Sequence, residues 1–342
     1  MLKVDVYESG VGETIIVTFP SGGVGVVDAH PSPGKLRPEI LQLLQGKHVH
    51  FVCLTHPHAD HGIDLVPVVR DQPQVDEFWH TVSDIAAFFF FPVTETKNFP
   101  SPMRALAAGM KARYARFLID LFHAVVTREI QMHQLRSDLQ KKILDGVEIH
   151  CLSPEEAVQH EVINAYRRQH EGEKVKIPDS NSLSAILVLV YAGRAVLLGA
   201  DALKKNWQTA IERYRKLGLP RASILKVPHH GASNAIVLHK KNIPNYLDVC
   251  SRNPDCKAIF VGGDSKHPDP DVFVRTRART DTVCLSNGLR TSASNPLGIT
   301  IPGARAAIPA TTCNAHVSIE IGSDGTVTRC IGDQCQDCPN LN

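Results

Sequence analysis

The sequence of 342 residues contains no long apolar run. A membrane-spanning helix needs roughly 18 to 20 consecutive apolar residues, and none of the segments approaches that length. Residues 1–6 also lack the charged and then apolar pattern of a signal peptide. We therefore expect a cytoplasmic protein without a membrane partner.

An excess of charge of one sign is missing as well. The 37 lysine and arginine residues almost balance the 35 aspartate and glutamate residues, which leaves a formal charge of +2. A global positive field of the kind that attracts nucleic acid is therefore excluded, whereas a local basic groove is not. With 43% hydrophobic and 21% charged residues, the composition is that of an ordinary globular protein and excludes a mainly disordered chain.

Neither a disulfide framework nor a repeat or low-complexity linker is visible. The nine cysteines are odd in number and widely spread, so we expect reduced thiols. We predict one domain over residues 1–342, with a helical insertion at about 84–146 and a cysteine-containing tail at about 313–342. The cysteine spacing in that tail fits either a structural zinc site or free thiols on a frayed segment.

Strand patterns and helical patterns alternate along the chain. Short strands separated by glycine turns fill the first thirty residues, and the apolar run 50–54 has the character of a buried strand. The spacing of apolar residues between about 84 and 146 predicts two or three amphipathic helices. Strands and helical segments follow from residue 147, and the last hairpin is turned at 323–325. This mixture indicates an α/β fold.

The densest polar cluster directly follows the run 50–54. His56, His58, Asp60 and His61 form an H-x-H-x-D-H pattern. Imidazole and carboxylate groups are ligands of zinc, iron and manganese, and a turn after a strand can aim several of them at one point. At the histidine frequency of this chain, such a match arises by chance roughly once in several hundred proteins. We therefore predict a metal site rather than a solvated histidine-rich turn.

Two further apolar strands deliver polar residues at their ends. The run 195–198 leads to Asp201, which on its own fits a helix N-cap equally well. The run 224–227 leads to His229 and His230. Because consecutive side chains point apart, we expect one of these histidines to bind a metal and the other to contact substrate or a carboxylate. The three strand ends are predicted to meet at one edge of a sheet.

These motifs resemble those of the metallo-β-lactamase-fold hydrolase superfamily. Within it, the chain looks most like the nuclease-like domain of bacterial competence DNA-uptake channel proteins and its soluble relatives. The segments that carry the resemblance run in the family's order over most of the chain, without the helical insertion and the last thirty residues: 6–17, 25–29, 56–61, 181–184, 199–201, 226–231, 262–264 and 267–268. The resemblance implies a four-layer αββα sandwich.

The resemblance also implies a site for two divalent metal ions, zinc or manganese. In this scheme His56 and His58 hold one ion, whereas Asp60 and His61 hold the other. Asp201 bridges the two ions.

The paired histidines would complete the second site. We assign His230 to the metal and His229 to catalysis, although the sequence does not decide between them. The family usually has a further histidine about twenty residues before the bridging aspartate, and Asp179 and Asn181 occupy that region here. Either one of them supplies an oxygen ligand, which shifts the preference towards manganese, or one metal binds weakly.

Hydrolysis is the reaction that such a site implies. Two metals lower the pKa of a bridging water towards neutrality, so a metal-bound hydroxide attacks the phosphorus or the carbonyl carbon whose oxygen the metals polarise. Asp60 could also steer the water or relay a proton. We predict that Lys266, Gly263 and Ser233 contact the substrate and that His267 protonates the leaving oxygen. Ordinary glycine-rich turns are the plain alternative at these positions.

Three functions are compatible with the motifs. A metal-dependent phosphodiesterase or nuclease ranks first, with a nucleic acid or another phosphodiester as its partner. Hydrolysis of a carboxylic ester, thioester or lactone on the same scaffold ranks second. A non-hydrolytic role, as an iron oxidoreductase or a partner-binding module, ranks third.

Overall fold

The computed structural model describes most of the chain. The described residues are 1–9, 12–30, 36–82, 112–137, 142–236, 243–252, 255–261, 267–280, 282–286 and 316–331. Within these ranges, no helix has both the length and the apolar character needed to cross a lipid bilayer.

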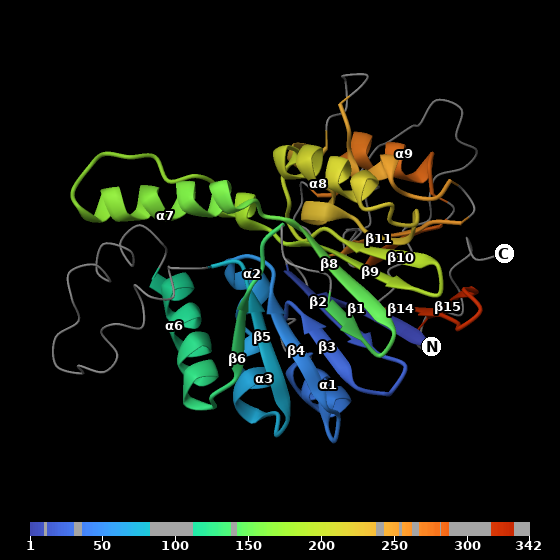
Figure 1. Cartoon of the computed structure of the whole chain (residues 1–342), viewed down its shortest axis with the longest axis horizontal. Coiled ribbons are helices and arrows are strands. Elements are labelled where there is room, and N and C mark those ends of the chain that lie inside the picture. The colour runs from blue at the N-terminus through green and yellow to red at the C-terminus, as the bar shows by residue number, and fades with distance from the viewer. Residues whose placement is uncertain are drawn as a thin grey trace, which may run out of the picture.

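Eight strands form the first sheet, in the order β15-β14-β1-β2-β3-β4-β5-β6 (Figure 1). Their bounds are Leu2–Ser9 for β1, Gly12–Thr18 for β2, Val24–Val27 for β3, Val49–Leu54 for β4, Val75–His80 for β5, Gln131–Gln134 for β6, His316–Ile321 for β14 and Val327–Ile331 for β15. The first three strands pair antiparallel as the predicted meander, and β3 to β6 run parallel. The predicted final hairpin is β14 and β15, and β14 pairs with β1.

Seven strands form the second sheet, in the order β13-β12-β11-β10-β9-β8-β7. Their bounds are Lys142–Leu144 for β7, Val147–Ser153 for β8, Ile186–Tyr191 for β9, Arg194–Leu198 for β10, Ala222–Lys226 for β11, Lys257–Val261 for β12 and Thr282–Ser286 for β13. The strands β10 to β13 are parallel, so their carboxyl ends lie along the same edge.

Helices cover the outer faces of both sheets. The α-helices are Leu36–Leu44 (α1), Ala59–Gly62 (α2), Leu65–Asp71 (α3), Ala112–Thr127 (α6), Glu156–His170 (α7), Lys204–Lys216 (α8) and Pro270–Arg277 (α9). Four short 3-10 helices are Ser180–Leu183 (η1), Pro228–Gly231 (η2), Ser233–Ala235 (η3) and Tyr246–Asp248 (η4). Figure 1 shows α1, α3 and α6 on the side of the first sheet and α8 and α9 on the side of the second.

Three apolar layers hold these elements together. One lies between the first sheet and helices α1, α3 and α6, a second between the two sheets, and a third between the second sheet and helices α8 and α9. Both faces of the later part of β4 are covered, which is why residues 51–54 are all apolar: Val52 and Leu54 face the helices, whereas Phe51 and Cys53 face the other sheet. The predicted four-layer αββα sandwich is confirmed.

The region expected to be a helical insertion contains strands as well as a helix. Helix α6 matches the predicted amphipathic pattern, and residues 83–111, including most of the first part of this region, lie outside the described residues. The later part, expected to be helical, contains β6 and β7 instead. These short strands form because β6 extends the parallel sheet beside β5 and β7 forms a hairpin with β8. The cysteine tail is described only up to Ile331.

Phe51 offers a direct test of the layer between the sheets. Its ring stacks on Trp79 with a centroid distance of 3.9 Å and an interplanar angle of 4°, and its side chain is almost fully buried. We predict that Phe51→Ala lowers the free energy of unfolding by about 3–5 kcal/mol, because it removes the stacked ring and leaves a cavity. Urea denaturation measures this loss. The exposed Ile143 on β7 is the control, and Ile143→Ala should have little effect. Equal effects of the two substitutions would contradict the assigned packing.

Candidate metal centre

Three strand ends bring the predicted metal ligands together. Strand β4 of the first sheet leads into His56 and His61, and helix α2 begins immediately after His58. In the second sheet, the parallel neighbours β10 and β11 lead to Asp201 and to η2, which contains His230. The motifs that are far apart in the sequence therefore meet where the carboxyl ends of strands from both sheets approach each other.

Asp201 lies at the centre of this group. Its Oδ1 is 3.5 Å from Nε2 of His61 and 3.7 Å from Nε2 of His230. Its Oδ2 is 3.7 Å from Nε2 of His229 and 4.0 Å from Nε2 of His56. Each carboxylate oxygen thus has its own pair of imidazoles. The side chain of Asp201 is 4% exposed, so this carboxylate is almost completely shielded from solvent.

The donor atoms fit divalent metal ions. Among the described residues, Nε2 of His56, His61 and His230 and Oδ1 of Asp201 are buried without a hydrogen-bond partner. Buried polar atoms normally have such partners, since leaving one unsatisfied costs about 1–3 kcal/mol. Four such atoms without hydrogen-bond partners lie around one point, and cations would satisfy them best. Imidazole nitrogen and carboxylate oxygen are suitable ligands for these cations.

The other two residues of the motif lie at the rim. Asp60 brings a carboxylate oxygen within 4.8 Å of ligand atoms of His61 and His230. The ring of His58 lies 4.6 Å from that of His56, measured between centroids, and its Nε2 is 2.8 Å from the hydroxyl oxygen of Ser180. Both residues are partly exposed, so a substrate or solvent molecule can approach from their side.

Both paired histidines face Asp201, although consecutive side chains were expected to point apart. His229 and His230 have φ values of 49° and 52°, in the left-handed region that most residues avoid. Two consecutive left-handed residues turn the chain tightly, so the alternation expected of extended residues does not apply. Nδ1 of His230 is 2.7 Å from the carbonyl oxygen of Val261, which fixes Nε2 as the atom that faces Asp201.

The two residues expected to replace the histidine that the resemblance implies differ in position. Asp179 is exposed and caps η1, where its Oδ1 accepts a hydrogen bond from the backbone N–H of Asn181 at 3.0 Å. The side chain of Asn181 lies closer to the cluster, with Nδ2 3.3 Å from Nε2 of His229. Its Oδ1 is buried and has no hydrogen-bond partner within the described part of the chain.

The predicted substrate-contacting residues are only partly described. The ring of His267 lies 6.1 Å from that of His229, measured between centroids, and is partly exposed. Ser233 is exposed at the start of η3, next to η2. Lys266 and Gly263 lie outside the described residues.

Sequence reasoning missed a layer of residues behind the ligands. Oδ2 of Asp28 lies 2.7 Å from Nδ1 of His61, and the same carboxylate accepts hydrogen bonds from the backbone N–H and hydroxyl of Thr55. Asp28 therefore orients His61 so that its Nε2 faces Asp201. An aspartate at the end of the apolar strand β3 was the available signal, because an ionisable group at that place needs a buried partner.

Sequence reasoning also missed the buried ion pair of Lys226 and Glu13. Lys226 is the last residue of β11 and is fully buried, where its ammonium group forms an ion pair with Glu13 and donates a hydrogen bond to the carbonyl oxygen of Ala200 at 3.2 Å. Oε1 of Glu13 also lies 3.8 Å from Nδ1 of His61. This pair joins the first sheet to the turn that carries Asp201.

The charges of Asp201 and His56 suit metal binding, whereas His61 holds a proton. Burial alone would raise the pKa of Asp201, but His230 and His61 hold it well below its usual value. Burial opposes the protonation of His61, yet Asp201 and Asp28 together raise its pKa well above its usual value. Burial lowers the pKa of His56 strongly, and the neighbouring His61 and His58 add to this effect. Asp201 is therefore charged and His56 neutral at neutral pH, as metal ligands must be, and a cation that binds Nε2 of His61 would displace the proton of that imidazole.

Of the comparisons with known proteins, only the one with solved structures finds proteins similar to this chain. No family model matches the sequence, and no curated protein matches it. Among solved structures, a possible metal-dependent hydrolase from Veillonella parvula has 12% identity and a TM-score of 0.42, covering 82% of this chain and 97% of its own. A diphosphatase of the PhnP family has 13% identity and a TM-score of 0.37, covering 84% of this chain and 95% of its own.

A diiron β-hydroxylase from Streptomyces venezuelae, CmlA, is similar over part of its length. It has 13% identity and a TM-score of 0.42, covering 82% of this chain. The match covers 53% of the hydroxylase, so this chain spans about half of that protein.

The buried pair of Glu13 and Lys226 gives a stability prediction. Glu13→Gln should lower the free energy of unfolding of the metal-free protein by about 3–5 kcal/mol, because it leaves the Lys226 ammonium buried without its partner. The double variant Glu13→Leu with Lys226→Met should recover much of this loss, since it removes both charges. Urea denaturation measures both effects. The exposed pair of Arg70 and Asp71 is the control, and a Glu13→Gln variant as mild as Arg70→Ala would contradict the prediction.

Proposed function

We propose that this protein is a metal-dependent hydrolase that acts on phosphodiesters. The observation that carries the proposal is the set of four imidazole Nε2 atoms within 4.0 Å of the two oxygens of the buried Asp201. Two divalent cations bound there would supply a water of lowered pKa and polarise the scissile phosphoryl oxygen.

The residues divide into two ligand groups around Asp201. Oδ1 faces His61 and His230, and a carboxylate oxygen of Asp60 lies near the ligand atoms of these two histidines. These residues would hold one cation. The opposite oxygen, Oδ2, faces His56 and His229, and His58 lies beside His56; these three would hold the other cation. We therefore propose that His229 takes the role of the histidine that the resemblance implies, with its Nε2 turned to the cation.

The preference for phosphodiesters rests on two features. The order of the motifs resembles the nuclease-like domain of competence DNA-uptake channel proteins. In addition, His267 lies beside His229 at the partly exposed side of the cluster, and its Nδ1 has no hydrogen-bond partner among the described residues. In our proposal His267 binds an anionic phosphate oxygen or protonates the leaving oxygen.

Activity tests this proposal on a panel of substrates. Protein loaded with zinc or manganese should cleave bis(p-nitrophenyl) phosphate or one of single-stranded DNA, duplex DNA, RNA and cyclic dinucleotides. Asp201→Asn should lower kcat/KM by more than about 100-fold, since even an outer partner of a ligand costs 10–100-fold. Circular dichroism should confirm that the variant is folded. His123→Ala, at an exposed position on α6, is the matched control and should retain activity.

Two outcomes would replace the proposal. Cleavage of lactones or carboxylic esters without any phosphodiester cleavage would favour the second hydrolase class. Iron in the protein as isolated, with no hydrolysis of any substrate, would favour an oxidoreductase.

Metal stoichiometry tests the role of His229 separately from activity. We predict that His229→Ala binds one divalent ion fewer than the unmodified protein after equilibrium dialysis, because one of the two ligand groups loses a ligand. Inductively coupled plasma mass spectrometry counts the ions. Asp179→Ala is the comparison, and it should keep the full number. The reverse result, with loss on Asp179→Ala alone, would identify the carboxylate as the ligand and contradict the role of His229.

A further inference from the structure

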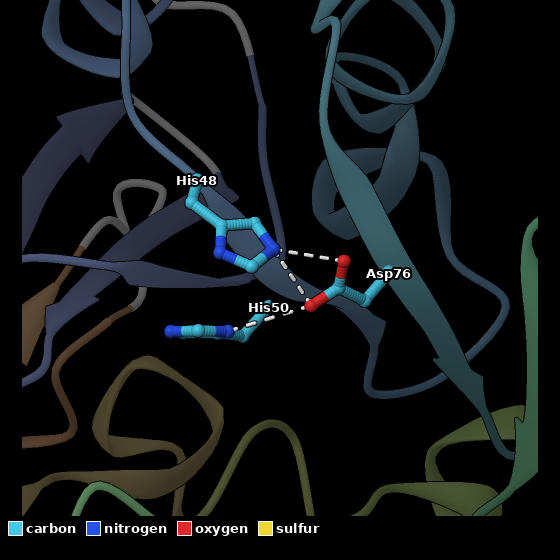
Figure 2. A group of neighbouring side chains, drawn as sticks. All are labelled: His48, His50 and Asp76. Carbon is cyan, nitrogen blue, oxygen red and sulfur yellow. Dashed lines mark hydrogen bonds and ion pairs between the residues drawn. The ribbon is translucent and has the colours of Figure 1, made fainter.

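A second group of metal-ligating side chains lies at the other end of β4. It consists of His48 and His50 together with Asp76, which precedes the buried part of β5 (Figure 2). Nε2 of His48 is 2.8 Å from both carboxylate oxygens of Asp76, and Nδ1 of His50 is 3.5 Å from Oδ2. Figure 2 shows both rings directing a nitrogen towards the carboxylate.

The backbone of β4 explains why both rings face the same carboxylate. Side chains two residues apart in a strand point to the same face, so His48 and His50 share one side. On the neighbouring strand β5, Val49 pairs with Val75 and Phe51 with Glu77, which places Asp76 beside His50. The rings of His48 and His50 consequently lie 4.4 Å apart between centroids, on the same side as Asp76.

His50 is held in a fixed orientation. Its side chain is 15% exposed, and its ring packs edge-on against Phe19 at a centroid distance of 5.7 Å. A Cβ at Gly23 would lie 2.2 Å from Nε2 of His50, so the absence of a side chain at Gly23 makes room for the ring. The ring is therefore positioned before any ligand binds, which lowers the entropic cost of binding.

A carboxylate lies behind His50 on the side away from Asp76. Oδ2 of Asp145, in the turn between β7 and β8, is 3.9 Å from Nε2 of His50, and the hydroxyl of Ser21 donates a hydrogen bond to it. Nε2 of His50 is buried and forms no hydrogen bond with the described residues. In metal sites, a histidine commonly directs its second ring nitrogen to such a carboxylate, which leaves the first nitrogen free for the metal.

The position of this group separates it from the candidate active site. His48 and His50 lie at the beginning of β4, whereas His56 and His61 follow its end. Six residues of β-strand span roughly 20 Å at about 3.3 Å per residue. A single ion cannot contact both groups. The side chains of His48 and Asp76 are 44% and 50% exposed, so an ion in solution can reach the second group directly.

We propose that His48, His50 and Asp76 form a separate binding site for one divalent transition-metal ion of the zinc type. Nε2 of His48, Nδ1 of His50 and a carboxylate oxygen of Asp76 are its ligands, and solvent completes the coordination. Asp145 orients His50. The ion ties the beginning of β4 to the beginning of β5 and, through Asp145, to a turn of the second sheet.

Zinc stoichiometry in two backgrounds tests this site. The double variant His56→Ala with Asp201→Asn removes ligands of the candidate active site and should still bind one zinc ion. Adding His48→Ala and Asp76→Asn to that background should abolish this ion. Native mass spectrometry counts the ions, and Co²⁺ absorption reports the coordination. Retention of the ion after the added substitutions, or absence of the ion before them, would overturn the proposal and leave an ordinary ion pair.

Two further variants keep the test specific. Asp145→Asn leaves all three ligands in place and should weaken zinc binding by about 10- to 100-fold, as expected for a residue that orients a ligand. His160→Ala is the matched control, since His160 forms an exposed pair with Glu156 on α7 that has no third ligand among the described residues. It should leave the zinc affinity unchanged. Hydrolysis by His48→Ala should equal that of the unmodified protein, so failure of this site and failure of the proposed hydrolase activity are distinguishable.

Discussion

The burial of one carboxylate among four imidazoles is the constraint on which the rest of this structure depends. An isolated charge in a protein interior is very costly unless opposite charges, hydrogen bonds or metal ions compensate it. For Asp201 the compensating groups come from the segments that follow β4 in the first sheet and β11 in the second. The two sheets must therefore lie face to face in one relative position, with the carboxyl ends of these strands adjacent. The apolar layer between the sheets, centred on residues such as Phe51, holds that position.

The ligands are in turn oriented by a second set of charges. Asp28 fixes His61 from behind, and the Lys226 side chain joins Glu13 to the backbone just before Asp201. These contacts link β2 and β3 of the first sheet to the turn after β10. The left-handed backbone at His229 and His230 stores strain that only such a well-defined environment can maintain. Precise ligand positions are thus a property of the whole interface between the sheets rather than of one loop.

Sequence patterns predicted the mixture of strands and helices, the resemblance supplied the four-layer arrangement, and the strand ends pointed to residues that the structure brings together. Apolar strands with polar residues at their ends are local signals, and His56, Asp201 and His230 follow such strands. The patterns failed where structure depends on distant partners. Strands β6 and β7 are short and exist because β5 and β8 pair with them, so their own residues carry little strand signal. The orientation of His229 follows from two residues with positive φ, which alternation along a strand does not predict. Lys226 at the end of an apolar strand has meaning only once Glu13 is known to lie beside it.

The ion pair of Glu13 and Lys226 has a consequence for the history of this protein. Each charge is harmful without the other, and each belongs to a different sheet, so single substitutions at either position pass through a weakened protein. Descendants of a common ancestor are therefore expected to keep both residues or to exchange both for neutral ones. Correlated variation between these two positions would then mark the lineages in which the junction of the two sheets has been preserved.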